Sequence, residues 1–162
     1  MTEIISAILS AILFIILIWF TYTIVNIYVT VIRCRKLDHS LKFCFNTAGK
    51  IIYIVLSILY VIGFIGGVSA FIYGLVKNSS LYYQNGLNVA SLLSVIYGYF
   101  LSTIVLIGRK NMMVGRMMID YRKMKKANFN YNHKMSFVYA QKDYSFSTRF
   151  VDTTQLKKAI SR

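Results

Sequence analysis

The chain is poor in the side chains that enzymes use for chemistry. Its 162 residues include five Asp and Glu residues and two His. The sequence has no paired carboxylates that suggest acid–base catalysis, no phosphate-binding glycine loop, no Ser-His-Asp order and no His-Glu-x-x-His motif. We therefore expect no catalytic residue and no cofactor, and a protein that is not an enzyme.

One group of residues invites a metal-site interpretation. Cys34, His39 and Cys44 recur at five-residue steps, and His133 could complete a set of two Cys and two His. Zinc motifs are dominated by shorter Cys-x₂₋₄-Cys pairs. The spacing therefore favours no metal, and two reduced thiols on the cytoplasmic side without a disulfide.

The abundant charged residues are basic: Lys and Arg number 19, and the formal net charge is +14. In a soluble protein this charge would suggest nucleic acid, but basic residues beside membrane spans set topology and attract anionic headgroups, at about 1 kcal/mol each. We expect anionic lipid as the partner, and nucleic acid is the weaker interpretation. Alternatively, the basic residues only determine the topology of the chain in the membrane. The residues expected to contact lipid or an acidic partner are Arg109, Lys110, Arg116, Arg122, Lys123, Lys125 and Lys126.

The composition indicates an integral membrane protein. Hydrophobic residues make up 57% of the chain and charged residues 15%, against about 25% charged in soluble domains. The mean hydropathy is +0.56. A soluble globule cannot bury so much apolar surface, so the elements that position any site are expected to be membrane helices.

Three charge-free segments, at about residues 4–32, 51–76 and 81–108, are each long enough to span a bilayer as a helix, which takes about 20 apolar residues. We predict a transmembrane domain over residues 1–108, with the second and third spans joined as a tight hairpin, and a basic cytoplasmic tail over 109–162. The basic residues follow the first span, unlike those of a signal peptide. The positive-inside rule predicts a multi-pass cell-membrane protein with its N-terminus outside and its C-terminus in the cytoplasm.

Small residues recur at four-residue spacing in two of these spans. This spacing keeps them on one helical face and allows close helix packing in lipid. These small residues can serve helix packing within one chain. Alternatively, they form an oligomerisation seam between chains or line a pore. The predicted packing residues are Gly63, Gly67, Gly86, Ala90, Ser94, Gly98 and Ser102.

The tail is expected to fold as a small α+β unit. Alternating aromatic residues on either side of residues 140–143 predict a β-hairpin, and Asp152 with Thr153 can cap a short helix. Residues 112–129 fit either a Met-rich surface helix or strands with a turn at Gly115, and we favour the strands.

The run from Asn111 to Lys126, followed by Ser136–Tyr139, Tyr144–Phe150 and the closing helix, resembles the tails of small uncharacterised bacterial multi-span membrane proteins. In those, transmembrane helices lead into a pleckstrin-homology-like β unit. The resemblance covers the last third of the chain, and no binding residues are carried over from it. The tail is short for a complete barrel, so we expect an incomplete sheet whose edges need cover from a partner or another protomer.

Three functions fit these patterns. The first is a non-enzymatic membrane protein that presents a basic cytoplasmic module for interaction, scaffolding or regulation at the inner face of a bacterial membrane. The second is a holin-like or other pore-forming oligomer, because three-span holins resemble the chain in topology and basic tail. The third is an immunity protein against a membrane-active peptide. In the pore-forming function the partner is another copy of this chain, so the protein is a homo-oligomer. An unidentified membrane protein is the alternative partner.

Overall fold

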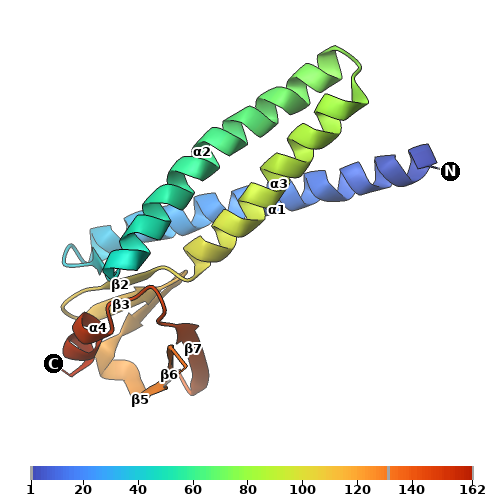
Figure 1. Cartoon of the computed structure of the whole chain (residues 1–162). Coiled ribbons are helices and arrows are strands. Elements are labelled where there is room, and N and C mark those ends of the chain that lie inside the picture. The colour runs from blue at the N-terminus through green and yellow to red at the C-terminus, as the bar shows by residue number, and fades with distance from the viewer. Residues whose placement is uncertain (1, 131, 162) are drawn as a thin grey trace. The chain divides into compact units, whose positions relative to one another are not determined.

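The computed structural model describes residues 2–130 and 132–161, without the side chains of residues 2, 3, 6 and 7. The chain divides into two compact units, coloured along the sequence in Figure 1. The helical unit consists of residues 1–26 and 54–100, and the sheet unit consists of residues 27–53 and 101–162. The sheet unit therefore combines the segment between the first two helices with the C-terminal tail.

The helices of the described residues are α1 (Thr2–Leu37), α2 (Thr47–Val76), α3 (Ser80–Ser102) and α4 (Thr153–Ile160). Two of them, over Ile8–Leu37 and Thr47–Val76, are long and apolar enough to cross a membrane. In the most apolar 18-residue stretch of each helix, only 17% of the first and 11% of the second is buried. A core helix of a soluble protein would be mostly buried, so these exposed apolar surfaces suit a lipid environment.

The predicted third span, residues 81–108, is only partly helical. Helix α3 ends at Ser102, and strand β2 follows at Val105–Ile107. The prediction was wrong here because a charge-free run of Ile, Val and Leu suits a buried strand as well as a helix. Strand β2 pairs antiparallel with β3, so this apolar run packs in the sheet unit.

The turn between α2 and α3 is as tight as the sequence predicts. Asn78 takes a positive φ of 52°, and the N–H of Ser79 donates a 2.9 Å hydrogen bond to the Gly74 carbonyl. This left-handed residue with a bond back to the last turn is a common helix ending. It reverses the chain within three residues, Lys77 to Ser79, and makes α2 and α3 an antiparallel pair.

The sheet unit contains two antiparallel sheets. One has four strands in the order β1-β2-β3-β4 and the other has three in the order β5-β6-β7. A short 3₁₀ helix, η1 (Tyr121–Lys123), connects the two sheets. The remaining strands are β1 (Lys42–Phe43), β3 (Asn111–Val114), β4 (Met117–Asp120), β5 (Met124–Asn130), β6 (Lys134–Tyr139) and β7 (Lys142–Ser147).

Residues 112–129 lie mostly in strands β3, β4 and β5, as favoured from the sequence, with η1 between β4 and β5. Gly115 occupies the predicted turn with φ +58°, and strands β3 and β4 flank it. The second predicted hairpin is formed by β6 and β7, where Tyr139 pairs with Lys142. The two residues between them, Ala140 and Gln141, both have positive φ, as a two-residue hairpin turn of the I′ type requires.

The segment between α1 and α2 completes the sheet, which the sequence did not predict. Strand β1 pairs with β2, and Phe45 forms an isolated bridge with Val151. An edge that we expected a partner to cover is therefore covered from within the chain. The buried core draws on both segments and consists of Cys44, Val105, Met112, Ile119, Met135, Phe137, Val151 and Leu156.

Helix α4 has the cap predicted for it. The Asp152 side chain accepts hydrogen bonds from the N–H groups of Thr154 (3.0 Å) and Gln155 (3.1 Å). Leu156 is fully buried in the core. The cap supplies partners for N–H groups that have none within the helix, and the buried leucine holds the helix against the sheets.

Candidate functional site

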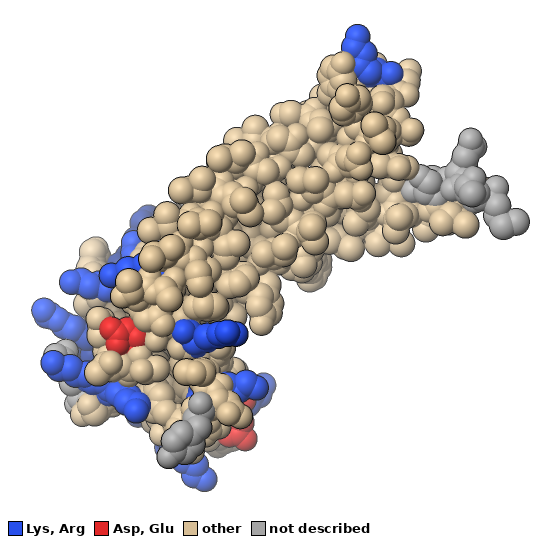
Figure 2. Space-filling model, in the orientation of Figure 1, with Lys and Arg blue, Asp and Glu red and all other residues tan. Residues whose placement is uncertain are grey.

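The seven predicted contact residues are all exposed on the sheet unit. On the face that Figure 2 shows, Lys and Arg gather over the strands, while the helical surface is almost entirely uncharged. The turns and η1 carry most of the seven: Arg109 and Lys110 lie between β2 and β3, Arg116 between β3 and β4, Arg122 and Lys123 in η1, and Lys125 and Lys126 in β5.

The fold brings some of these residues together and separates one. The N–H of Tyr121 donates a 3.1 Å hydrogen bond to the Lys110 carbonyl, which places η1 beside the β2–β3 turn. Asn111 pairs with Asp120 at that end, and Val114 pairs with Met117 at the other. Arg116 therefore lies at the opposite end of this sheet from Arg109.

The nearby carboxylates are occupied by neutral donors. Asp120 accepts a 2.9 Å hydrogen bond from the N–H of Arg122. Asp38 accepts bonds from the N–H of Ser40 (3.0 Å), the Oγ of Ser40 (2.5 Å) and the Nδ2 of Asn111 (3.3 Å). The hydroxyl of Ser40, above all, lowers the pKa of Asp38. These carboxylates keep their negative charge, but the seven basic residues outnumber them, so the charge of this region stays positive.

A groove of about 600 Å³ opens between the ends of β1 and β2 and helix α4. Its basic lining residues are Lys42, Arg109 and Lys158, which come from three separate segments. Only Arg109 was among the predicted contact residues. No local pattern in the sequence indicates the other two, because Lys42 comes close to the tail only through the pairing of β1 with β2.

One wall of this groove is a closely packed turn. The N–H of Arg109 donates a 2.8 Å hydrogen bond to the Oγ of Ser40, and the N–H of Gly108 donates one of 2.8 Å to the Asn111 carbonyl. A Cβ at position 108 would lie 2.9 Å from both the Oδ2 of Asp38 and the Oγ of Ser40. A side chain at position 108 would therefore displace Asp38 or Ser40, and the hydrogen bond from the Arg109 N–H fixes the backbone at that residue.

The residues considered for a metal site lie apart. Cys34 and Cys44 are buried, whereas His39 and His133 are exposed in two different turns. The Cys44 thiol donates to the Asp152 carbonyl at 3.4 Å, and burial raises the pKa of this thiol to about 11. Within residues 2–130 and 132–161, no three His, Cys, Asp or Glu side chains are grouped to hold a metal ion.

Six of the seven predicted packing residues belong to the helical unit, and each glycine among them lies close to a residue of a neighbouring helix. A Cβ on Gly86 would lie 2.6 Å from the Gly67 carbonyl oxygen and 2.5 Å from the Phe71 nitrogen. Ala90 and Ser94 are buried on the same face of α3. A Cβ on Gly63 would collide with Leu93, and one on Gly98 would lie 2.9 Å from the Phe20 ring. Ser102, the last of the predicted stripe, is exposed.

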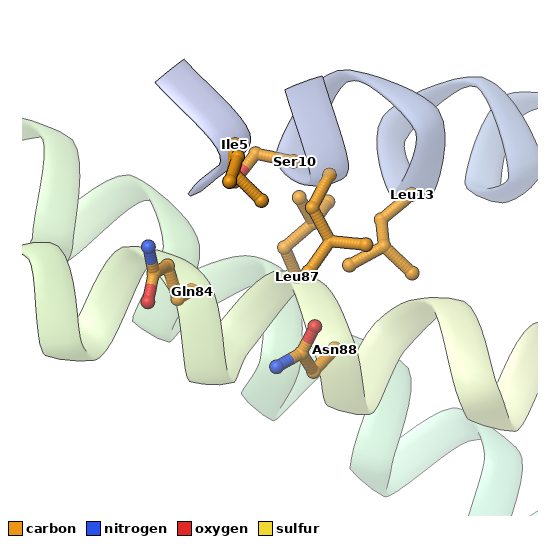
Figure 3. Close-up of a pocket in the computed structure, with 7 residues that line it drawn as sticks. Ile5, Ser10, Leu13, Gln84, Leu87 and Asn88 are labelled. Atoms are coloured by element: carbon orange, nitrogen blue, oxygen red, sulfur yellow. The ribbon is translucent and has the colours of Figure 1, made fainter. Parts of the chain in front are cut away.

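The helical unit also has an open cavity of about 320 Å³ between α1 and α3. Figure 3 shows Ser10 and Leu13 of α1 facing Leu87 of α3, with the amides of Gln84 and Asn88 beside them. The side chains that line it are apolar or neutral, so it offers no charge for an ion and no group for acid–base catalysis.

Comparison of the chain with protein-family models, with curated proteins and with solved structures finds no match. The resemblance to membrane proteins with a pleckstrin-homology-like tail therefore stays a prediction.

Proposed function

We propose that the protein is a non-enzymatic membrane protein whose three-helix anchor presents the basic sheet unit at the inner face of a bacterial membrane. Its role there is interaction, scaffolding or regulation, through contact with anionic headgroups or an acidic partner. The observation that carries the proposal is the exposure of all seven predicted basic residues on a folded unit. The nearby carboxylates Asp38 and Asp120 are meanwhile bonded to neutral donors.

Helix α3 is proposed as the third span although it is less apolar than α1 and α2. It has 23 residues, which gives a length of about 34 Å at 1.5 Å per residue, enough for the hydrocarbon core. Close approaches along its length, at Gly67 with Gly86 and at Gly74 with Tyr83, hold it beside α2. Its polar Ser91 and Ser94 are buried and bonded to backbone carbonyls, so they are not exposed to lipid.

The orientation follows from the basic flanks. Lys77 is the basic residue of the α2–α3 turn, whereas the segments 33–50 and 109–162 carry the others. Basic segments stay on the cytoplasmic side. We therefore place the N-terminus and the α2–α3 turn outside, and the sheet unit in the cytoplasm.

The two alternative functions have less support. A pore-forming oligomer would use the small-residue stripe of α3 between protomers, but Gly86, Ala90 and Gly98 pack against neighbours within the chain. No observation favours an immunity protein over the proposed role. Induced expression separates the pore from both others, because a pore would collapse the membrane potential and the others would leave growth unchanged.

The test uses the full chain in nanodiscs, because the sheet unit includes residues 27–53 as well as the tail. Amide hydrogen exchange of residues 109–126 is compared between phosphatidylcholine and phosphatidylcholine mixed with phosphatidylglycerol. We expect slower exchange with the anionic lipid and reversal of this protection by added salt, because contacts between exposed charges are screened.

A charge-matched pair of variants sharpens this test. Gln at Arg122, Lys123 and Lys125 should remove a large part of the protection, whereas Gln at Lys134, Lys142 and Arg149 removes the same charge elsewhere and should leave most of it. Equal exchange in both lipids would show that the seven residues do not contact headgroups. Equal loss in both variants would contradict a localised contact.

A further inference from the structure

We infer that the groove between β1, β2 and α4 is a binding site for a phosphate monoester, carried by a lipid headgroup or by a small soluble molecule. This site overlaps the seven proposed membrane-contact residues at Arg109 only. The inference does not require the proposed contact with the membrane surface, so each can fail without the other.

The charge of the groove fits an anion. Lys42, Arg109 and Lys158 converge on it from a strand, a turn and a helix. Asp38, beside its wall, keeps its negative charge while it accepts hydrogen bonds from Ser40 and Asn111, so the three basic residues outnumber it and leave the groove positive. All three side chains are exposed, and the fold places them around one groove, so a bound anion can accept hydrogen bonds from cations of three separate segments.

The groove also offers the donors that a phosphate recognises. Arginine presents a planar fork that binds two phosphate oxygens at once, and lysine adds a compact charge. The Gln155 amide and the His39 ring line the same groove and can donate to ester or hydroxyl oxygens of the ligand. Ile107 and Ala159 complete the lining and give an apolar surface for the carbon part of an ester.

The backbone of Arg109 is held in place before any ligand binds. Its backbone N–H is bonded to the Ser40 hydroxyl, which in turn donates to Asp38. A Cβ at Gly108 would lie within 3.0 Å of Asp38, Ser40 and Asn111 atoms, so the turn is closely packed. A site whose supporting groups are already in place binds with a smaller ordering cost. The volume, about 600 Å³, is in the range of small-molecule sites, roughly 300–1,000 Å³, and leaves room for a headgroup-sized ester.

The test uses two ligands with the same phosphate monoester. Glycerol 3-phosphate is titrated by calorimetry into the full chain in phosphatidylcholine nanodiscs, and phosphatidic acid is incorporated in separate nanodiscs with amide exchange of residues 39–42 as the readout. Binding of the soluble ester alone identifies a free phosphorylated molecule, an effect of the lipid alone identifies a headgroup, and either result supports the site.

Three single-charge variants decide whether binding occurs in the groove. Lys42→Gln and Lys158→Gln should each weaken binding about tenfold, because each removes a charge-assisted hydrogen bond to phosphate. Lys142→Gln removes the same charge outside the groove and should change binding less than about twofold. Absence of binding by both ligands, or equal weakening by all three variants, would overturn the inference.

Discussion

The backbone N–H of Arg109 donates a 2.8 Å hydrogen bond to the side-chain oxygen of Ser40, which lies 69 positions earlier in the chain. This bond joins the β2–β3 turn to the segment between α1 and α2. The same hydroxyl donates to Asp38, so one small side chain connects a carboxylate and a backbone amide. The loop and the tail therefore depend on each other for their structure.

The first prediction concerns this connection. Ser40→Ala removes both hydrogen bonds and should lower the free energy of unfolding of the sheet unit by about 1–2 kcal/mol, a typical cost for leaving partners unsatisfied. Ser145→Ala, at an exposed position of β7, is the control and should change it by less than about 0.5 kcal/mol. The measurement is chemical unfolding of the full chain in detergent. Equal effects of the two substitutions would show that the bond contributes nothing.

The second prediction is that the tail cannot fold by itself. An isolated fragment of residues 109–162 lacks β1 and β2, and with them Cys44 and Val105 of the buried core. Its circular dichroism should be that of a largely disordered chain, and it should unfold without a cooperative transition. A strand-rich spectrum with cooperative unfolding would show that the loop is not needed for the fold.

The third prediction concerns the contact between α2 and α3. Gly86→Ala places a methyl group 2.5 Å from the Phe71 nitrogen, and the overpacking should cost about 2 kcal/mol. Gly66→Ala is a matched control on α2, because nothing lies within 4 Å of a Cβ there, and alanine favours the helix. The thermal unfolding midpoint in detergent should fall for the first variant and stay or rise for the second. The packing described for α3 would be contradicted if both variants behaved alike.

The fourth prediction concerns acid stability. The hydrogen bonds from the N–H groups of Gln155 and Thr154 lower the pKa of Asp152 from its ordinary value of 3.8. The carboxylate form is therefore favoured in the folded chain, and its contribution is present above about pH 4. That contribution is lost as the pH falls through the lowered pKa.

Two substitutions at this cap separate the charge from the hydrogen bonds. Asp152→Asn keeps the accepting oxygen without titrating, so the unfolding midpoint should depend less on pH over about 2 to 5. Asp152→Ala removes the cap and should cost about 1 kcal/mol at neutral pH. Chemical unfolding followed across this pH range provides the measurement. An unchanged pH dependence in the Asn variant would mean that Asp152 does not contribute to it.

Much of the fold could be predicted from local sequence. The turn after Val76, the turn at Gly115 and the cap at Asp152 each depend on residues close to one another in sequence. Glycine and asparagine allow positive φ, and aspartate accepts bonds from a helix start. These preferences act without any tertiary contact, which is why the sequence alone indicates them.

The features that escaped prediction depend on contacts between distant segments. Strand β1 has two residues, too few for an alternating pattern, and it forms because β2 lies beside it. The run after Ser102 was predicted as the end of a helix because hydropathy does not distinguish a lipid-facing helix from a buried strand. The groove was not predicted because Lys42 and Lys158 line it together only in the complete sheet unit.

The most direct test of the proposed function is the sidedness of the two ends of the anchor. Ser80→Cys at the start of α3 and Ser145→Cys in β7 are each labelled with a membrane-impermeant maleimide, before and after the cells are permeabilised. The unsubstituted chain is the control, because Cys34 and Cys44 are both buried and should stay unlabelled. The proposal predicts that the Ser80→Cys variant is labelled in intact cells and that the Ser145→Cys variant is labelled only after permeabilisation. Labelling of the Ser145→Cys variant from outside, or the same sidedness for both variants, would contradict a three-span anchor that holds the basic unit in the cytoplasm.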